Sequence, residues 1–111
     1  MIYLIQERGT QEQIEQMLET LDDYIKLAVD IERKILAGGG ELHADCEAVL
    51  LENGSKQVDI WGADWYPLTQ EVGYESLINI RPRQNNRSMD IQDPAIRERV
   101  AEIVKNLLGG L

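Results

Sequence analysis

Two stretches in which apolar and polar residues alternate, separated by Gly38-Gly39-Gly40, dominate the first half of the sequence. Residues 24–36 carry apolar side chains mostly at odd positions, and residues 41–51 carry them at even positions. A two-residue period is typical of strands that bury one face. Because glycine accepts positive φ freely, the three glycines are predicted to turn the chain. The pattern therefore predicts a long β-hairpin over residues 24–51.

A helix over residues 24–36 is the alternative interpretation, because Leu27, Ile31 and Ile35 also lie four positions apart. A helix would leave Ile25 and Val29 off its apolar stripe. The strand interpretation, which places all five side chains on one face, is therefore favoured.

Three further strands are predicted. Residues 2–5 form a short run rich in β-branched and aromatic side chains. Residues 57–66 follow Asn53-Gly54, a pair typical of hairpin turns, and end before Pro67, which cannot donate to a ladder. Residues 74–81 supply the last strand.

Two helices are predicted, one near each end of the chain. Thr10 and Gln13 have the spacing of a capping box at the start of a helix over residues 11–21. Asp93 as N-cap and Pro94 at the first helical position open a second helix. The apolar stripes are Ile14, Met17, Leu18 and Leu21 in the first helix, and Ile96, Val100, Ile103, Val104, Leu107 and Leu108 in the second.

These elements predict one domain over residues 1–111, with the order β-α-β-β-β-β-α. The fold class is α+β: a two-layer arrangement of a mostly antiparallel, five-stranded sheet with both helices on one face. The other face of the sheet is expected to be polar. With 43% hydrophobic residues, the chain has an ordinary composition for a folded globular domain.

The chain is acidic, and its charge is unevenly distributed. The 11 Lys and Arg against 20 Asp and Glu give a net charge of −9. Residues 1–75 carry 5 basic and 16 acidic side chains, whereas residues 76–111 carry 6 basic and 4 acidic ones, so the two parts are expected to attract. A net negative surface disfavours non-specific binding of nucleic acid, which depends on neutralising phosphates.

Hydropathy and cysteine content indicate a cytoplasmic protein that does not cross a membrane. No apolar run approaches the roughly 20 residues that span a bilayer. One cysteine, Cys46, forms no internal disulfide, and with the one histidine, His43, it makes no Cys/His zinc site within one chain. Cys46 belongs to the apolar set and is expected to be a buried, inert thiol.

The predicted hairpin gathers acidic side chains on its polar face. Its register sets Asp30 opposite Glu47, and Glu32 opposite Asp45. Like charges in facing positions destabilise a sheet, so these carboxylates require a neutralising group. The candidate polar surface consists of Asp30, Glu32, Glu41, His43, Asp45 and Glu47.

Two neutralising groups are considered for this surface. The favoured one is arginine from residues 81–87, which would make an internal network of ion pairs. The other is a divalent cation such as Mg²⁺ or Mn²⁺, because carboxylates with one imidazole suit a hard metal ion. No cofactor is otherwise predicted.

Two further groups are candidate binding residues. Arg81, Arg83, Asn86 and Arg87 combine guanidinium and amide groups in one loop and form a candidate anion site. Trp61 and Trp65 lie four apart and share one strand face. They are expected to pack in the core, with a partner contact as the alternative.

Three stretches resemble a bacterial family of small uncharacterised proteins of about 110 residues, a domain of unknown function often met in photosynthetic bacteria. These are ILAGGGELHADCEAVLLENGS (35–55), DIWGADW (59–65) and SLINIRPRQNNRSM (76–89). The resemblance implies no activity and transfers no catalytic residue. It implies that the polar hairpin and the arginine loop are family features, at Glu41, His43, Asp45, Glu47, Arg81, Arg83, Asn86 and Arg87.

Three functions are carried forward from the sequence. The first is a small non-enzymatic binding or assembly module that associates with itself, because the tryptophan pair and the open face and edges of the sheet require covering. An unknown protein is the other partner considered. The second is a metal-dependent hydrolase or nuclease-like enzyme that uses the acidic hairpin face and holds an anionic substrate on the arginine loop. The third is a regulatory domain that binds a small anionic ligand.

Overall fold

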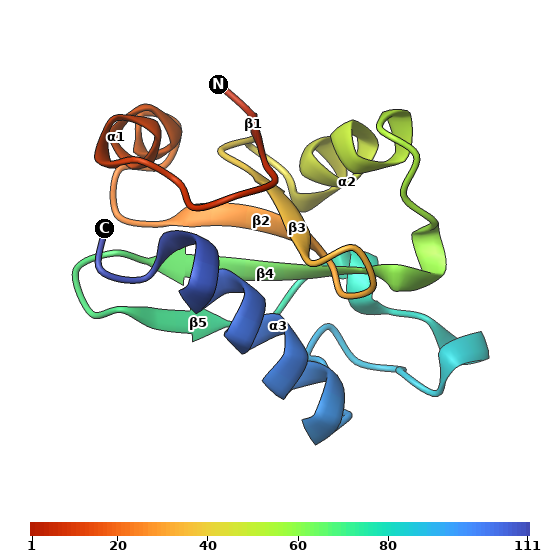
Figure 1. Ribbon diagram of the computed structural model, residues 1–111. Coiled ribbons are helices and arrows are strands. Elements are labelled where there is room, and N and C mark those ends of the chain that lie inside the picture. Colours follow the sequence, from red (N-terminus) through yellow and green to blue (C-terminus); the bar gives the residue numbers. More distant parts are fainter.

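A computed structural model describes residues 1–111 as a five-stranded antiparallel sheet with helices packed on it (Figure 1). The strand order is β1-β3-β2-β4-β5. The elements are β1 Tyr3–Ile5, α1 Gln11–Leu18, β2 Ile25–Asp30, β3 Ile35–Gly38, α2 His43–Glu52, β4 Ile60–Tyr66, β5 Glu71–Gly73 and α3 Pro94–Leu108. The predicted α+β class with a five-stranded antiparallel sheet is confirmed.

The sheet is buried on both faces, because alternate residues of each strand enter two separate apolar clusters. On one face, odd-numbered residues of β2 and β4 pack against α1 and α3. On the other face, Ala28, Ile35 and Ile60 pack against Cys46 and Leu50 of α2. The expected pair of helices on one face is present, but α2 adds a third layer. The face predicted to be polar is therefore largely covered.

Both predicted helix starts are confirmed. The Thr10 side chain accepts a hydrogen bond from the Gln13 backbone, and the Gln13 side chain accepts one from the Thr10 backbone, which completes the capping box. Asp93 caps the Ala95 backbone N–H, and Pro94 occupies the first position of α3. Local side-chain hydrogen bonds therefore fix the first residues of α1 and α3.

The strand predicted over residues 24–36 is instead a hairpin of β2 and β3. Asp30 pairs with Ile35, and the turn lies between them. The buried Asp30 side chain accepts hydrogen bonds from the backbones of Glu32 and Arg33, and Lys34 takes a positive φ of 58°. The turn contains neither glycine nor proline, and the apolar–polar pattern continues through it, so no break in the strand is visible in the sequence.

The second predicted strand, residues 41–51, is the helix α2, so the proposed hairpin face and its register were wrong. The alternation arose because Ala44 and Ala48 occupy even positions, yet both are exposed. The side chains that are buried, Cys46, Glu47 and Leu50, follow the spacing of a helix. Alanine, leucine and glutamate also favour helix intrinsically, and here that preference outweighs the apparent two-residue period.

Asn53 and Gly54 end α2 rather than form a hairpin turn. Asn53 is the C-cap, and Gly54 follows with a φ of 101°. An Asn-Gly pair serves both structures, because each needs a residue with positive φ. Gly39 also has a positive φ, of 103°, where the chain leaves β3.

Residues 74–81 do not form a strand, and β5 takes the fifth place in the sheet. Leu77–Asn79 is a turn of 3₁₀-helix, with Leu77 exposed and Asn79 fully buried. The Asn79 side chain accepts a hydrogen bond from Gly62 N and donates to Gly62 O, so it occupies the open edge of β4. A Cβ at Gly62 would lie 2.5 Å from the Cβ of Ser76, so this approach requires glycine.

Trp61 and Trp65 lie in the core beneath α1 and α3, with 1% and 0% of their surface exposed. Their ring faces are therefore used for packing, and neither offers a surface to a partner. The outermost strands, β1 and β5, have three residues each, so little unpaired edge remains. None of the helices is both long and apolar enough to traverse a bilayer.

Replacing Asn79 by alanine should lower the free energy of unfolding by about 2–4 kcal/mol, because Gly62 N–H and C=O lose their partner in a buried place. Urea denaturation measures this change. Asn106→Ala, at an exposed position of α3, is the control and should change stability by less than about 0.5 kcal/mol. Equal effects of the two substitutions would contradict the edge role of Asn79.

The Cys46 thiol should be inert in the folded protein. Burial raises its pKa from 9.0 to about 11. Between these pH values the unfolded chain loses the thiol proton and the folded chain keeps it, so stability should fall as pH rises from about 9 to 11. Urea denaturation of wild type and Cys46→Ala across this range should show a steeper fall in wild type, because Tyr66, whose pKa is also raised, contributes to both. Rapid modification of native Cys46 by a thiol reagent at pH 8 would contradict it.

Candidate functional site

The acidic residues that the sequence placed on one hairpin face have different partners in the structure. Asp30 is buried in the β2–β3 turn, whereas Glu41 and Asp45 are exposed at the start of α2. Glu32 pairs with Arg99 at 3.0 Å, Glu47 with Arg81 at 3.5 Å and His43 with Asp64 at 2.8 Å. No group of three or more His, Cys, Asp or Glu side chains is placed to hold a metal ion. The predicted metal set is therefore dispersed.

The structure forms a different site, a groove between α2 and residues 74–84, which follow β5 in the chain. Three hollows adjoin along it. The histidine hollow contains His43 and Asp64, and the arginine hollow contains Glu47 and Arg81. Leu77 and Ile78 line both of these hollows. The third, the acidic hollow, shares Asp64 and Glu75 with the histidine hollow. We call these three adjoining hollows together the α2 groove, although only the first two are lined by residues of α2.

The histidine hollow has a volume of about 420 Å³. His43 Nε2 lies 2.8 Å from Asp64 Oδ1 and 3.1 Å from the Ala63 carbonyl oxygen. Both neighbours are acceptors, so Nε2 carries a hydrogen and Nδ1 is the ring nitrogen left without a partner. Nδ1 makes no hydrogen bond within the protein. This atom can accept a hydrogen bond or a proton from a bound group.

The arginine hollow, of about 720 Å³, is built around Arg81. Its guanidinium donates to the carbonyl oxygens of Ile78 and Gln57, lies 3.5 Å from Glu47 and stacks 4.9 Å from the ring centre of Trp61. Burial lowers the pKa of Arg81, and the Glu47 carboxylate opposes that shift. Arg81 therefore joins α2, the start of β4 and residues 77–81.

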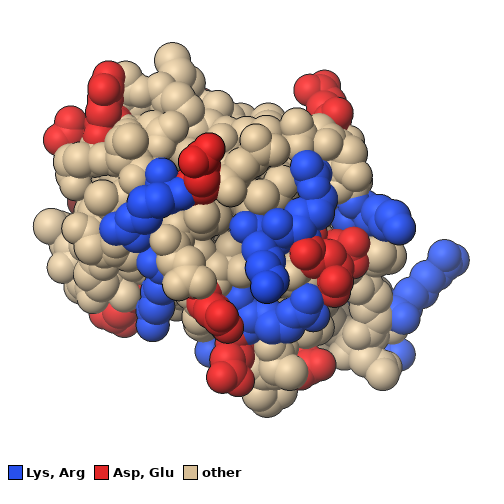
Figure 2. Space-filling view, viewed as in Figure 1, with Lys and Arg blue, Asp and Glu red and all other residues tan.

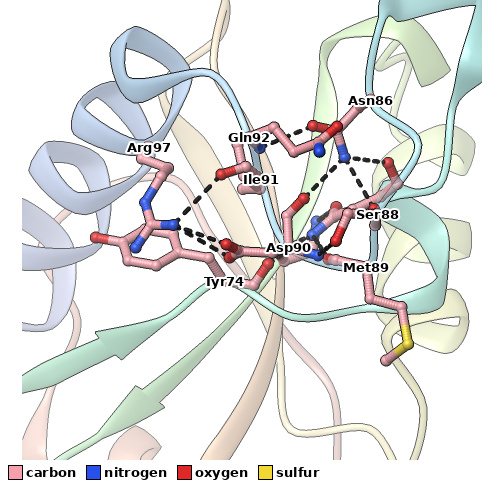
Figure 3. Close-up of polar contacts among 10 residues, drawn as sticks. Tyr74, Asn86, Ser88, Met89, Asp90, Ile91, Gln92 and Arg97 are labelled. Atoms are coloured by element: carbon pink, nitrogen blue, oxygen red, sulfur yellow. Dashed lines mark hydrogen bonds and ion pairs between the residues drawn. The ribbon is translucent and has the colours of Figure 1, made fainter.

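The acidic hollow, of about 480 Å³, lies where residues 74–90 approach α3. Arg97 of α3 pairs with Asp90 at 3.0 Å and stacks 4.3 Å from the ring centre of Tyr74 (Figure 3). Burial raises the pKa of Tyr66 in this hollow, and the charges of Asp64 and Glu75 add to the increase. The local potential here is negative.

Asn86 holds the chain beneath this end of the groove. It is 2% exposed, and its side chain donates to the carbonyl oxygens of Asn79, Ser88 and Asp90 while accepting from Gln92 N (Figure 3). A buried amide with this many partners fixes a loop that has no regular ladder. The Asn86 amide, which the sequence placed in a candidate anion site, is thus engaged within the protein.

The other residues of the predicted anion site separate into two groups. Arg81 is committed to Glu47 and Trp61, as the internal pairing interpretation expected. Arg83 and Arg87 are exposed and make no ion pair. Of these two exposed arginines, Arg83 lines the arginine hollow and Arg87 lines none of the three hollows. The structure therefore gives the four residues different surroundings.

Exposed aliphatic side chains border the α2 groove. Leu77 is 73% exposed, Val58 58% and Leu42 57%. Ile80 and Met89 are also exposed beside the same hollows. Single exposed apolar residues are ordinary on protein surfaces, whereas several that line one groove mark an interaction surface.

Sequence reasoning missed Asp64, Leu77 and Asn79, which contribute most to this groove. The sequence offered one indirect indication for Asp64, a charged residue on the otherwise apolar strand of residues 57–66. The partnership of Asp64 with His43 depends on α2 lying over β4, which no spacing in the sequence specifies.

Charge on the opposite, α3-covered face is mixed. Figure 2 shows Lys and Arg side chains intermingled with Asp and Glu on the face viewed in Figure 1. The exposed Arg99–Glu32 pair joins the C-terminal part of the chain to its acidic N-terminal part, as Arg81–Glu47 does. The expected attraction between the two parts is thus realised in two ion pairs.

Removing the Glu47 carboxylate should destabilise the protein strongly. Glu47→Ala leaves the Arg81 guanidinium, whose side chain is 10% exposed, without its carboxylate, so unfolding should become easier by about 3 kcal/mol. Thermal or urea denaturation measures this. Glu52→Ala, at the exposed end of the same helix, is the matched control and should be almost neutral. A neutral effect of Glu47→Ala would show that the pair does not hold the groove.

Comparisons with known proteins identify the family but no activity. A family model described as "Protein of unknown function (DUF5674)" matches residues 3–107 of the 111-residue chain. No curated protein and no solved structure matches the chain. The three stretches that resemble an uncharacterised family lie inside the matched range. The chain belongs to the DUF5674 family.

Proposed function

We propose that this protein is a binding module and that its α2 groove receives an extended segment of a partner protein. The observation that carries this proposal is the set of exposed aliphatic side chains along the arginine and histidine hollows, which share Leu77. Leu42, Val58 and Leu77 are each more than half exposed and all line the groove. Burying such side chains against a partner is favourable by about 25 cal/mol per Å² of apolar surface.

The polar groups that line the groove are already paired within the protein, which favours binding without rearrangement of the groove. Glu47 is already paired with Arg81, and His43 with Asp64. A bound segment would not need to neutralise these groups, because their partners come from the protein itself. Preformed pairs of this kind reduce the ordering cost of association.

An elongated partner segment fits the site better than a second copy of the same chain. Each copy carries a net charge of −9, so two copies repel one another. The sheet face that was expected to require a covering subunit is already covered by α2. The three hollows also follow one another along a single stretch of the chain, from Arg83 past Leu77 to Glu75.

Selection from random short peptides displayed on phage tests this proposal. Peptides enriched on the wild-type protein should lose about tenfold or more in affinity for Leu77→Glu, because a charge would replace the aliphatic side chain at the centre of the groove. Leu77 is exposed, so the variant should fold normally. Isothermal titration measures the affinities.

Leu68→Glu is the matched control, because Leu68 is 92% exposed but lines none of the three hollows. It should bind the selected peptides like wild type. Selection of no peptide that distinguishes Leu77→Glu from Leu68→Glu would overturn the proposal. So would sedimentation equilibrium showing a dimer that Leu77→Glu dissociates, since the groove would then serve a second copy.

A further inference from the structure

We infer that the segment received by the α2 groove carries a basic residue at one end, an aliphatic residue in the middle and an acidic residue at the other end. This inference rests on the proposed function and adds the chemistry of the partner. It follows from the unpaired charges that line the groove, which have opposite signs at its two ends.

The acidic hollow supplies the negative end. Asp64, Glu75 and Asp90 line it together with one basic residue, Arg97. Arg97 is committed to Asp90. Glu75 is exposed and makes no ion pair, so its carboxylate is free to receive a lysine or arginine of the partner.

The arginine hollow supplies the positive end. Its charged residues are Glu47, Arg81 and Arg83. Glu47 and Arg81 are paired with each other and are almost buried. Arg83 remains exposed and unpaired in a hollow bordered by Val58 and Ile80. A partner carboxylate there would find a forked donor beside an apolar surface.

The histidine hollow between the two ends is the place for the aliphatic residue. Leu42, Leu77 and Met89 border it. Among its charged residues, Asp64 is paired with His43, and Lys26 donates to the Glu41 carbonyl oxygen. Glu75 lies where this hollow adjoins the acidic hollow. The centre of the groove therefore offers exposed aliphatic side chains for contact, and Glu75 marks its boundary with the acidic end.

This arrangement specifies the partner by charge order rather than by net charge. A wholly basic segment meets Arg83, and a wholly acidic one meets Glu75, so each is opposed at one end. Like-charge contacts at an interface penalise the wrong partner more than matched pairs favour the right one. Exposed pairs are screened by ions, so binding should weaken as ionic strength rises.

Reversing the sign of one charge in the peptide and of its proposed partner in the protein tests the inference. The enriched peptides should share a basic, an aliphatic and an acidic position. Changing the acidic position to lysine should weaken binding to wild type by about five- to tenfold, and Arg83→Glu should restore it. Changing the basic position to glutamate should weaken binding to a similar extent, and Glu75→Arg should restore it.

Two exposed residues near the groove serve as controls. Arg87→Glu alters an unpaired arginine that lines none of the hollows, and Glu71→Arg alters an exposed carboxylate of β5. Neither should restore binding of the exchanged peptides. Enriched peptides without the charge order, or rescue by the control variants, would overturn this inference while leaving the proposed function intact. Failure to enrich any peptide that depends on Leu77 would overturn the proposed function itself.

Discussion

The hydrogen bonds between the Asn79 side chain and the backbone of Gly62 are the contacts on which the groove depends. Beyond the three residues of β5, the edge of β4 has no neighbouring strand, and a buried backbone group there requires a partner. A single amide supplies both a donor and an acceptor. Because Asn79 is held against Gly62, Leu77 and Ile78 come to lie opposite α2, and the hollows form between them.

Other buried polar side chains also supply hydrogen-bond partners to backbone groups outside regular secondary structure. Asp30 closes the β2–β3 turn, Asn86 fixes the loop before α3, and Arg81 connects three elements while stacking on Trp61. Each of these side chains hydrogen-bonds to backbone groups that have no partner in regular secondary structure. The irregular half of the molecule is thereby fixed well enough to present an aliphatic surface of defined shape.

The prediction of the fold from sequence succeeded where a pair of nearby residues decides where a helix begins. Thr10 with Gln13, and Asp93 with Pro94, opened helices at the expected positions. It failed where two structures share one pattern. Small alanines made α2 look like an alternating strand, and Asn53-Gly54, a pair common to hairpins and helix ends, reinforced that error. The acidic hairpin face followed from this one misassignment, so its candidate site residues were dispersed with it.

The sequence by itself determined the α+β class, the two capped helices and the excess of negative charge, because these depend on local chemistry and composition, whereas the five predicted strands matched the sheet in number but only partly in position. The tertiary structure alone decided which residues meet. His43 and Asp64 lie 21 positions apart, and Arg81 and Glu47 lie 34 apart. Their meeting depends on α2 packing across β4 and on Asn79 closing the edge of the sheet, and contacts across such separations leave no periodic trace in the sequence.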